Sequence, residues 1–311
     1  MRRTRRLAMS GALLAVASLL SSGTAMAAGT TIYNTIPSPT PGNVPSLGYE
    51  ATSTSEFGDQ VAFAAGPRQL REITVLMSSW GCESGGWNTN DCVTTPGATF
   101  SHAITVNVYA VGTGNSVGAL AATKTQTFAI PYRPSADPDC TGGRWEESPA
   151  VCYNGFATPI TFDLASLNVT LPNNAIVSVA YNTSHYGYAP IGDSTACYTS
   201  SGGCGYDSLN VGVVDPALTQ TSGTNPAPTD AYFNTSYAPY YCDLGAGGVG
   251  VFRLDAGCWA GFKPALKVTA SYAAPQNANA CKKDGWKTLS RADSSDFKNQ
   301  GDCIQYANTG K

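Results

Sequence analysis

Apolar and polar residues alternate with a period of two in many short segments of the chain. Between residues 104 and 109, isoleucine and valine take one side of an extended segment, while threonine, asparagine and tyrosine take the other. Similar runs occupy residues 60–65, 70–78, 124–130, 159–164, 175–182, 208–214, 249–254 and 266–272. Each run is rich in β-branched or aromatic residues and is bounded by glycine, proline or asparagine, which is typical of β-strands.

Helical periodicity is not sustained anywhere between residues 29 and 273. A series of short strands separated by turn residues favours an antiparallel β-sandwich, and we expect a jelly-roll-like arrangement over residues 50–273. A domain of that length buries a sizeable core. The predicted fold class is therefore all-β.

The first 28 residues have the three parts of a cleavable secretion signal. Four arginines come first, an apolar run from Leu7 to Leu20 follows, and Ala25 and Ala27 supply small residues for cleavage. The rest of the chain lacks a run of about 18 apolar residues, so we expect no membrane span after leader cleavage. The sequence predicts a secreted protein, either extracellular or associated with the cell surface.

Two flanking regions differ from the predicted sandwich. Residues 29–49 contain four prolines, which predicts a spacer or an edge segment. Residues 274–280 are expected to form a linker, and residues 281–311 a small separate module. This module has six basic and four acidic residues, whereas residues 29–280 have eight basic and 17 acidic ones. A small basic unit is thus expected to follow an acidic domain, and it is a candidate for association with anionic cell-wall polymers.

Charge argues against nucleic acid as a partner. The leader holds four of the 18 basic residues and none of the 21 acidic ones, so its removal leaves a net charge of −7. Only 13% of the residues are charged, below the usual figure of about 25%. Nucleic-acid recognition needs a dense basic face, which this composition does not provide.

All ten cysteines follow the leader and form couples that are close in sequence. An even number of cysteines in a secreted chain predicts disulfides, although the sequence alone leaves other pairings open. Because the predicted sandwich is large enough for a core of its own, we expect the bridges mainly to pin loops. The expected pairs are Cys82 with Cys92, Cys140 with Cys152, Cys197 with Cys204, Cys242 with Cys258, and Cys281 with Cys303.

The C-terminal module carries a specific pattern. Two cysteines, Cys281 and Cys303, bracket a Gly-Trp pair at 285–286 and the run Phe-Lys-Asn-Gln-Gly at 297–301. This pattern resembles a short module found at the C-termini of many secreted bacterial proteins, which implies a secreted bacterial context and no particular chemistry. The phrases at 182–184 and 206–211 resemble uncharacterised exported bacterial β-sandwich proteins.

The module is too small for a core to stabilise it alone, so a bridge between its two cysteines is expected. We also expect a short helix between Phe297 and Asn308, with Asp296 or Ser295 as its N-cap.

Residues 181–210 form the segment most suggestive of ligand binding. Tyrosine faces stack on sugar rings, asparagine and aspartate bind hydroxyl groups, and a loop fixed by a disulfide loses less freedom on binding. A glycan is therefore the expected ligand class. The candidate ligand-binding residues are Asn182, His185, Tyr186, Tyr188, Tyr206 and Asp207, and Trp80, Trp87, Trp145, Tyr240 and Tyr241 beside other disulfide loops are further candidate platforms.

Acidic residues near the Cys140/Cys152 couple are candidate calcium ligands. Asp137 and Asp139 lie close in sequence to Glu146, Glu147 and Asp163, and calcium prefers such clusters of oxygen atoms in loops. The alternative is a solvated acidic loop. Calcium is the only cofactor that the sequence suggests.

Enzymatic activity is the main alternative to binding. Residues 114–118 match the pattern Gly-x-Ser-x-Gly, but the elbow around a nucleophilic serine needs a helix after it, and a strand is expected here. The stretch is therefore interpreted as a hairpin loop, although Ser116, Asp163 and His185 are a formal triad. Glu146 and Glu147 are adjacent, so they point to opposite sides of an extended segment. A secreted hydrolase acting on polysaccharide or ester, and a structural surface protein without a small ligand, both remain alternatives.

Overall fold

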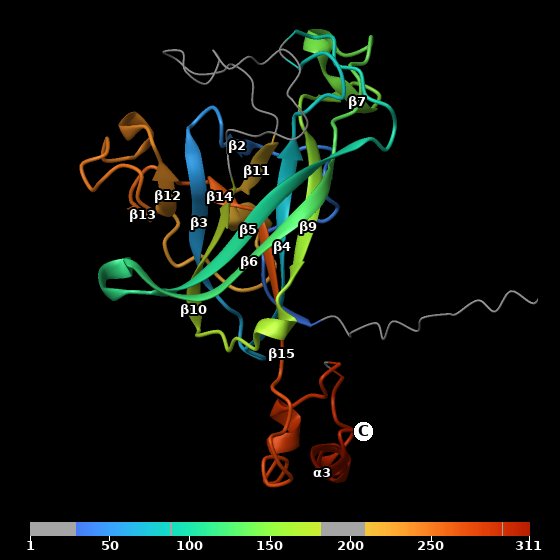
Figure 1. The fold of residues 1–311 in the computed structure, drawn as a ribbon, viewed down its shortest axis with the longest axis vertical. Coiled ribbons are helices and arrows are strands. Elements are labelled where there is room, and N and C mark those ends of the chain that lie inside the picture. The colour runs from blue at the N-terminus through green and yellow to red at the C-terminus, as the bar shows by residue number, and fades with distance from the viewer. Residues whose placement is uncertain (1–28, 88, 182–208, 294) are drawn as a thin grey trace, which may run out of the picture.

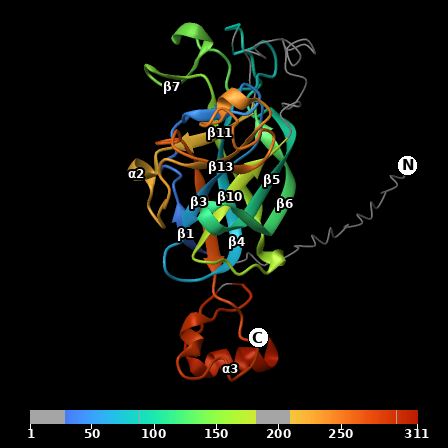
Figure 2. The same ribbon diagram turned by 90° about the vertical axis from the view of Figure 1, so that its left-hand side faces the viewer.

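A computed structural model describes residues 29–87, 89–181, 209–293 and 295–311. The chain folds into an antiparallel β-sandwich followed by a small C-terminal helical module (Figures 1 and 2). The predicted all-β class with a disulfide-bonded helical module at its end is confirmed.

Among the described residues, the first sheet has seven strands. Its main path runs β1-β15-β4-β11-β14, with β9 paired to β4 and β2 paired to β11. The strands are β1 (Thr30–Asn34), β2 (Ser46–Gly48), β4 (Gln69–Ser79), β9 (Phe156–Asp163), β11 (Leu209–Val214), β14 (Lys263–Pro264) and β15 (Leu266–Ser271).

In the part of the chain that the structure describes, the second sheet has six strands in the order β13-β12-β3-β10-β5-β6. These are β3 (Thr54–Ala62), β5 (Thr99–Val111), β6 (Val117–Pro131), β10 (Asn174–Ala180), β12 (Ala231–Thr235) and β13 (Arg253–Asp255). A separate hairpin of β7 (Trp145–Ser148) and β8 (Val151–Tyr153) lies at the end of the sandwich opposite the C-terminal module (Figure 1).

The strand order is that of a jelly roll. Strands β1, β15, β4 and β9 are neighbours in one sheet, and β3, β10, β5 and β6 are neighbours in the other. Along the chain these strands alternate between the two sheets except at the β5–β6 hairpin, which is how a jelly roll wraps its two Greek keys. The short strands β11, β12, β13 and β14 are inserted between β10 and β15.

The core lies between the two sheets and follows the alternation in the sequence. On β4, Ile73 is fully buried and lies between Val268 of β15 and Phe162 of β9. On the opposite sheet, Val177 of β10 pairs with Val108 of β5. These side chains belong to one continuous apolar cluster, whose burial is the main stabilising contribution.

Helical elements are short throughout the described residues. The 3₁₀ turns are η1 (Thr113–Asn115), η2 (Thr141–Gly143), η3 (Ala165–Leu167), η4 (Ala238–Tyr240) and η5 (Gly285–Thr288), and the α-helices are α2 (Pro216–Thr219) and α3 (Gln300–Thr309). Within the described part of the chain, none of these helices is long and apolar enough to cross a membrane.

Two regions differ from the expected strand pattern. Residues 249–254 are mostly turn and only Arg253–Asp255 form a strand, because glycines at 248 and 250 adopt positive φ angles. Residues 231–235 form β12, which the alternation does not reveal. In the proline-rich segment, β1 pairs with β15 at the edge of the first sheet, in agreement with the edge-segment alternative.

The C-terminal module has its own small core around the Cys281–Cys303 disulfide. Phe297 is buried against this disulfide, and Tyr306 packs on Phe297 with ring centroids 5.5 Å apart. The predicted helix is present as α3, but its N-cap is Asn299, whose side chain accepts a hydrogen bond from the backbone of Asp302. The expected caps Ser295 and Asp296 lie before the helix, so the predicted cap was wrong.

Eight of the ten cysteines lie among the described residues, and they form four of the expected disulfides. These bridges are Cys82–Cys92, Cys140–Cys152, Cys242–Cys258 and Cys281–Cys303. Such bridges are typical of extracellular proteins. The expected pairing of these eight residues is therefore confirmed.

The fifth expected disulfide differs from the other four because the structure does not describe its residues. Cys197 lies outside the described residues, and Cys204 lies outside them as well. The bridge between Cys197 and Cys204 is therefore neither confirmed nor contradicted, and it stays a prediction.

Truncating the core of the central strand should destabilise the whole sandwich. We expect Ile73→Ala to lower the free energy of unfolding by about 2–5 kcal/mol, because it leaves a cavity between two paired strands. Urea unfolding followed by circular dichroism measures this. The matched change Leu218→Ala, at a side chain that is 84% exposed, should alter stability by less than about 0.5 kcal/mol. Equal effects of both changes would contradict the assigned core.

Candidate binding site

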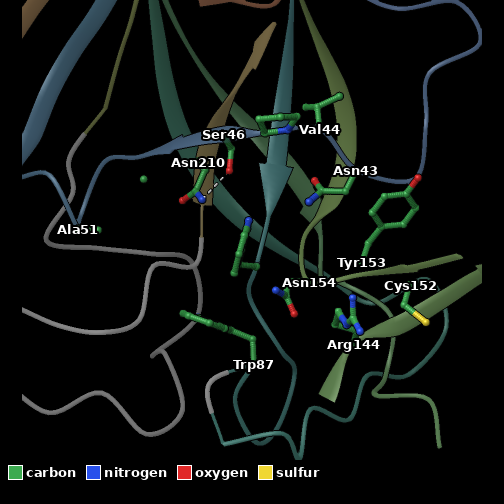
Figure 3. A pocket seen from close by; sticks show the side chains of 13 residues that line it. Asn43, Val44, Ser46, Ala51, Trp87, Arg144, Cys152, Tyr153, Asn154 and Asn210 are labelled. Carbon is green, nitrogen blue, oxygen red and sulfur yellow. Dashed lines mark hydrogen bonds between the residues drawn. The ribbon is translucent and has the colours of Figure 1, made fainter. Parts of the chain in front are cut away.

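A cleft of about 600 Å³ opens beside the β7–β8 hairpin (Figure 3). This hairpin lies at the end of the sandwich opposite the C-terminal module (Figure 1). Its walls come from segments far apart in sequence. The described residues that line it are Asn43, Val44, Pro45, Ser46, Gly48, Ala51, Trp80, Trp87, Arg144, Cys152, Tyr153, Asn154 and Asn210.

Two tryptophans form the aromatic wall of the cleft. Trp80 directly follows β4, and Trp87 lies in the loop closed by the Cys82–Cys92 disulfide. Their ring centroids are 4.7 Å apart with an interplanar angle of 85°, so the edge of one ring meets the face of the other. Both side chains are half-buried, which leaves part of each ring accessible.

A chain of hydrogen bonds holds Trp80 in place. The indole Nε1–H of Trp80 donates to Ser78 Oγ at 3.0 Å, and the Ser78 hydroxyl donates to Asn43 Oδ1 at 2.7 Å. Gly155 passes close to this chain, because a Cβ atom there would lie 2.5 Å from both Ser78 Oγ and Trp80 Nε1. The absence of a side chain at 155 therefore lets the backbone just before β9 pass beside the hydrogen bonds of Trp80, Ser78 and Asn43.

Three asparagines contribute amide groups to the cleft. Asn43 and Asn154 enter from the proline-rich segment and from the turn after β8, and the Asn210 amide donates to Ser46 Oγ at 2.9 Å (Figure 3). Each amide has both donor and acceptor atoms. The cleft thus combines flat apolar surfaces with neutral polar groups.

Charge enters the cleft at one point of the described lining. Arg144 is half-buried, and its guanidinium donates to the backbone oxygen and the hydroxyl of Thr141, at 2.9 Å in both cases. Among the described lining residues there is no aspartate, glutamate or histidine. This part of the lining is therefore equipped to bind a ligand and offers no carboxylate or imidazole for proton transfer.

The six predicted ligand-binding residues Asn182, His185, Tyr186, Tyr188, Tyr206 and Asp207 lie outside the described residues. The same is true of Cys197 and Cys204, the two cysteines that were expected to fix this segment. The glycan-binding role of the segment stays a prediction.

The additional aromatic candidates divide into two groups. Trp80 and Trp87 line the cleft. Trp145 and Tyr241 are buried and have structural contacts: the Trp145 indole donates to Gly155 O at 2.7 Å, and the Arg253 guanidinium lies over the Tyr241 ring. Tyr240 is 40% exposed and donates a hydrogen bond to the backbone of residue 51 at 2.9 Å.

The contributions of Asn43, Tyr153 and Asn154 were not expected. They come from turns far apart in the chain, so no spacing in the sequence links them all. An asparagine in a proline-rich stretch and the Tyr-Asn-Gly sequence at 153–155 are the only local signals.

Three of the five acidic candidates lie close together. One carboxylate oxygen from each of Asp137, Asp139 and Glu146 lies within 4.8 Å of the others. However, Asp137 Oδ1 accepts a hydrogen bond from the Asp139 backbone, and Glu146 Oε1 accepts one from the Ala150 backbone. These hydrogen bonds stabilise local turns, and they are sufficient to explain why the three carboxylates lie together. Calcium binding stays a prediction.

The Gly-x-Ser-x-Gly stretch forms the expected hairpin loop. Its serine, Ser116, lies between η1 and β6, and the hydroxyl donates to Thr113 O at 2.9 Å. Strand β6 follows directly, so the helix that a nucleophile elbow requires is absent at this described position. The third member of the formal triad, His185, lies outside the described residues.

Comparison of the chain with protein-family models, with curated proteins and with solved structures found no match. The residues of the cleft are therefore the basis for inferring its function.

Adding a methyl group at residue 155 should damage the cleft. We expect Gly155→Ala to lower stability by about 1–3 kcal/mol, because the new Cβ overpacks against Ser78 and Trp80. Thermal unfolding and near-ultraviolet circular dichroism, which reports tryptophan packing, measure the effect. A variant with the wild-type melting temperature and spectrum would show that the backbone at residue 155 does not pass this close to Trp80.

Proposed function

We propose that the protein is a secreted binding module that holds a glycan in the cleft lined by Trp80 and Trp87. The observation that carries this proposal is the placement of two partly accessible indole rings beside the amides of Asn43, Asn154 and Asn210. The disulfides and the predicted leader also support this proposal, but they do not specify which sugar is bound.

The chemistry of the lining suits a sugar. The apolar face of a pyranose ring packs on an aromatic ring, and the hydroxyl groups around its rim both donate and accept hydrogen bonds. Asparagine amides can satisfy either role. Because the two indoles are perpendicular, one ring can support the face of a sugar while the other borders its edge.

Disulfides on two sides of the cleft favour binding. Trp87 lies within the Cys82–Cys92 loop, and Cys152, which lines the cleft, is bonded to Cys140. A loop that is already ordered loses little conformational freedom when a ligand arrives. Ordering of these loops therefore subtracts little from the binding free energy.

Secretion fits the same function. The leader predicted at residues 1–28 and the four disulfides both indicate an oxidising, extracellular environment, where polysaccharides are abundant. The resemblance of residues 281–311 to a module of secreted bacterial proteins supports the secreted context and does not specify the ligand.

Hydrolysis is less well supported at this site. A glycosidase needs two carboxyl groups about 5–10 Å apart across the sugar, and the described lining has none. A structural role is the interpretation to adopt if no polymer binds.

Removing one indole should weaken binding strongly. We expect the mature protein to be retained on at least one class of insoluble or soluble glycan, and Trp87→Ala to raise the Kd by roughly thirty-fold, equivalent to about 2 kcal/mol. Trp87→Phe should restore part of the affinity because it keeps an aromatic face. Affinity electrophoresis and pull-down on cell-wall polymers, cellulose, chitin and xylan measure this.

The matched control is Trp286→Ala, which removes an indole from the C-terminal module and leaves the cleft unchanged. It should bind as well as the wild type. Loss of binding in this control with none in Trp87→Ala would place recognition in the module. Loss only on replacing Tyr186 and Tyr188 would move it to the segment 181–210. Absence of retention on every polymer would exclude the proposal.

A further inference from the structure

A lysine and an aspartate are buried together between the two sheets. Asp59 lies on β3, on the same side of the strand as the core residues Phe57 and Val61. Lys263 lies on β14 in the opposite sheet. The side chains are 1% and 0% exposed, and Lys263 Nζ is 3.7 Å from Asp59 Oδ1. Two ionisable groups thus meet where the remainder of the interior is largely apolar.

The two carboxyl oxygens of Asp59 have different environments. Oδ2 accepts a hydrogen bond from the Asn225 side chain at 2.7 Å. Oδ1 is buried and has no hydrogen-bond partner among the described residues. Oδ2 therefore accepts a hydrogen bond as the carbonyl oxygen of an amide would. Oδ1 lies 3.7 Å from the lysine nitrogen and accepts no hydrogen bond from the described residues.

The lysine nitrogen is held by backbone carbonyl groups. Nζ donates to Ala227 O at 3.3 Å and makes a short contact with Asp230 O. A neutral amine has two hydrogen atoms, and these two carbonyl groups can accept both of them. The lone pair of the nitrogen then points in a different direction. The distance from Nζ to Asp59 Oδ1 is longer than a normal hydrogen bond, so this pair is not the close ionic contact that compensates burial of two charges.

We propose that Lys263 and Asp59 form an intramolecular isopeptide bond that joins β14 to β3. A proton passes from the ammonium group to the carboxylate, which leaves an amine and a carboxylic acid. The amine nitrogen then attacks Asp59 Cγ, one N–C bond forms, and the C–Oδ1 bond breaks. Oδ1 departs with two protons as one water molecule, so atoms and charges balance without an oxidant or reductant.

The surroundings favour the reacting forms. Burial is the largest influence on both groups: the pKa of Asp59 is raised to about 7 and the pKa of Lys263 is lowered, although the attraction between the two groups acts in the opposite direction on each pKa. The buried Tyr33 and the carboxylate of Asp230 are nearby groups that interact with this pair, and the negative charge of Asp230 raises the pKa of both Asp59 and Lys263. Holding the amine nitrogen 3.7 Å from Asp59 Oδ1 in a buried site also replaces a bimolecular encounter by an intramolecular one.

The product fits the same hydrogen-bond partners. The amide oxygen, formerly Oδ2, keeps the Asn225 donor, and the single remaining N–H has a backbone carbonyl acceptor at residue 227 or 230. Bond formation removes two buried charges and leaves a neutral, satisfied amide, which is far less costly to bury. It also links the two sheets covalently across residues 59 and 263.

Mass spectrometry of the intact mature wild-type protein, after unfolding and full reduction of its disulfides, tests this proposal. The expected mass is lower than that of the linear sequence by one water molecule. Trypsin should then release one branched peptide that joins the fragment ending at Arg68 to residues 254–267. Because Pro264 follows Lys263, trypsin does not cut at Lys263 in either state, so the cleavage pattern is the same with and without the bond.

Lys263→Arg keeps a positive charge but removes the primary amine, and this variant should show the full linear mass. Lys267→Arg, on the adjacent strand β15, is the matched control and should still lack one water. If Lys263→Arg does not fold, the wild-type peptides remain decisive. Two unbranched peptides of full mass from the wild type would overturn the proposal and leave the pair as a buried ionic contact. A missing water located in any other peptide would overturn it equally.

Discussion

The register of β4 is the constraint on which the sandwich and its cleft both depend. Ile73, Val75 and Met77 point into the space between the sheets, so Leu76, Ser78 and Trp80 point to the outer face of the first sheet. The proline-rich segment packs on that face through Val44, and its Asn43 meets Ser78. A slip of one residue would bury Ser78 in the core and remove Trp80 from the cleft. Core packing and site geometry are thus set by the same pairing.

Period-two alternation predicted most long strands correctly because it reports a direct physical requirement, that one face of each strand is buried. It failed where other interactions decide the structure. In residues 249–254 the glycines allow turns that outweigh the alternation, whereas β12 is short and has few alternating positions. The helix of the C-terminal module was recognised, but its cap depends on which side chain reaches a free backbone N–H, and here Asn299 reaches it.

The cleft could be anticipated only in part. Tryptophans beside disulfide loops were a reasonable signal, because a bridged loop can hold a large ring at the surface, and this holds for Trp80 and Trp87 but not for the buried Trp145. The asparagines are brought together by tertiary contacts between turns, which leave no spacing to detect. Gly155 is instructive: its role depends on a neighbour 77 positions earlier in the chain, Ser78.

Disulfides in this protein lie in segments that the backbone hydrogen bonds of the two sheets do not order. The Cys82–Cys92, Cys140–Cys152 and Cys242–Cys258 bridges close loops outside the main strands, where backbone pairing contributes little order. Asp59 and Lys263 differ, since they meet between the two sheets, within the apolar core. Hydrophobic burial is not directional, so by itself it specifies the relative position of the sheets less strictly than a directional contact does. A polar or covalent contact across the interface fixes their relative position, and with it the place of the β4 end that carries the cleft.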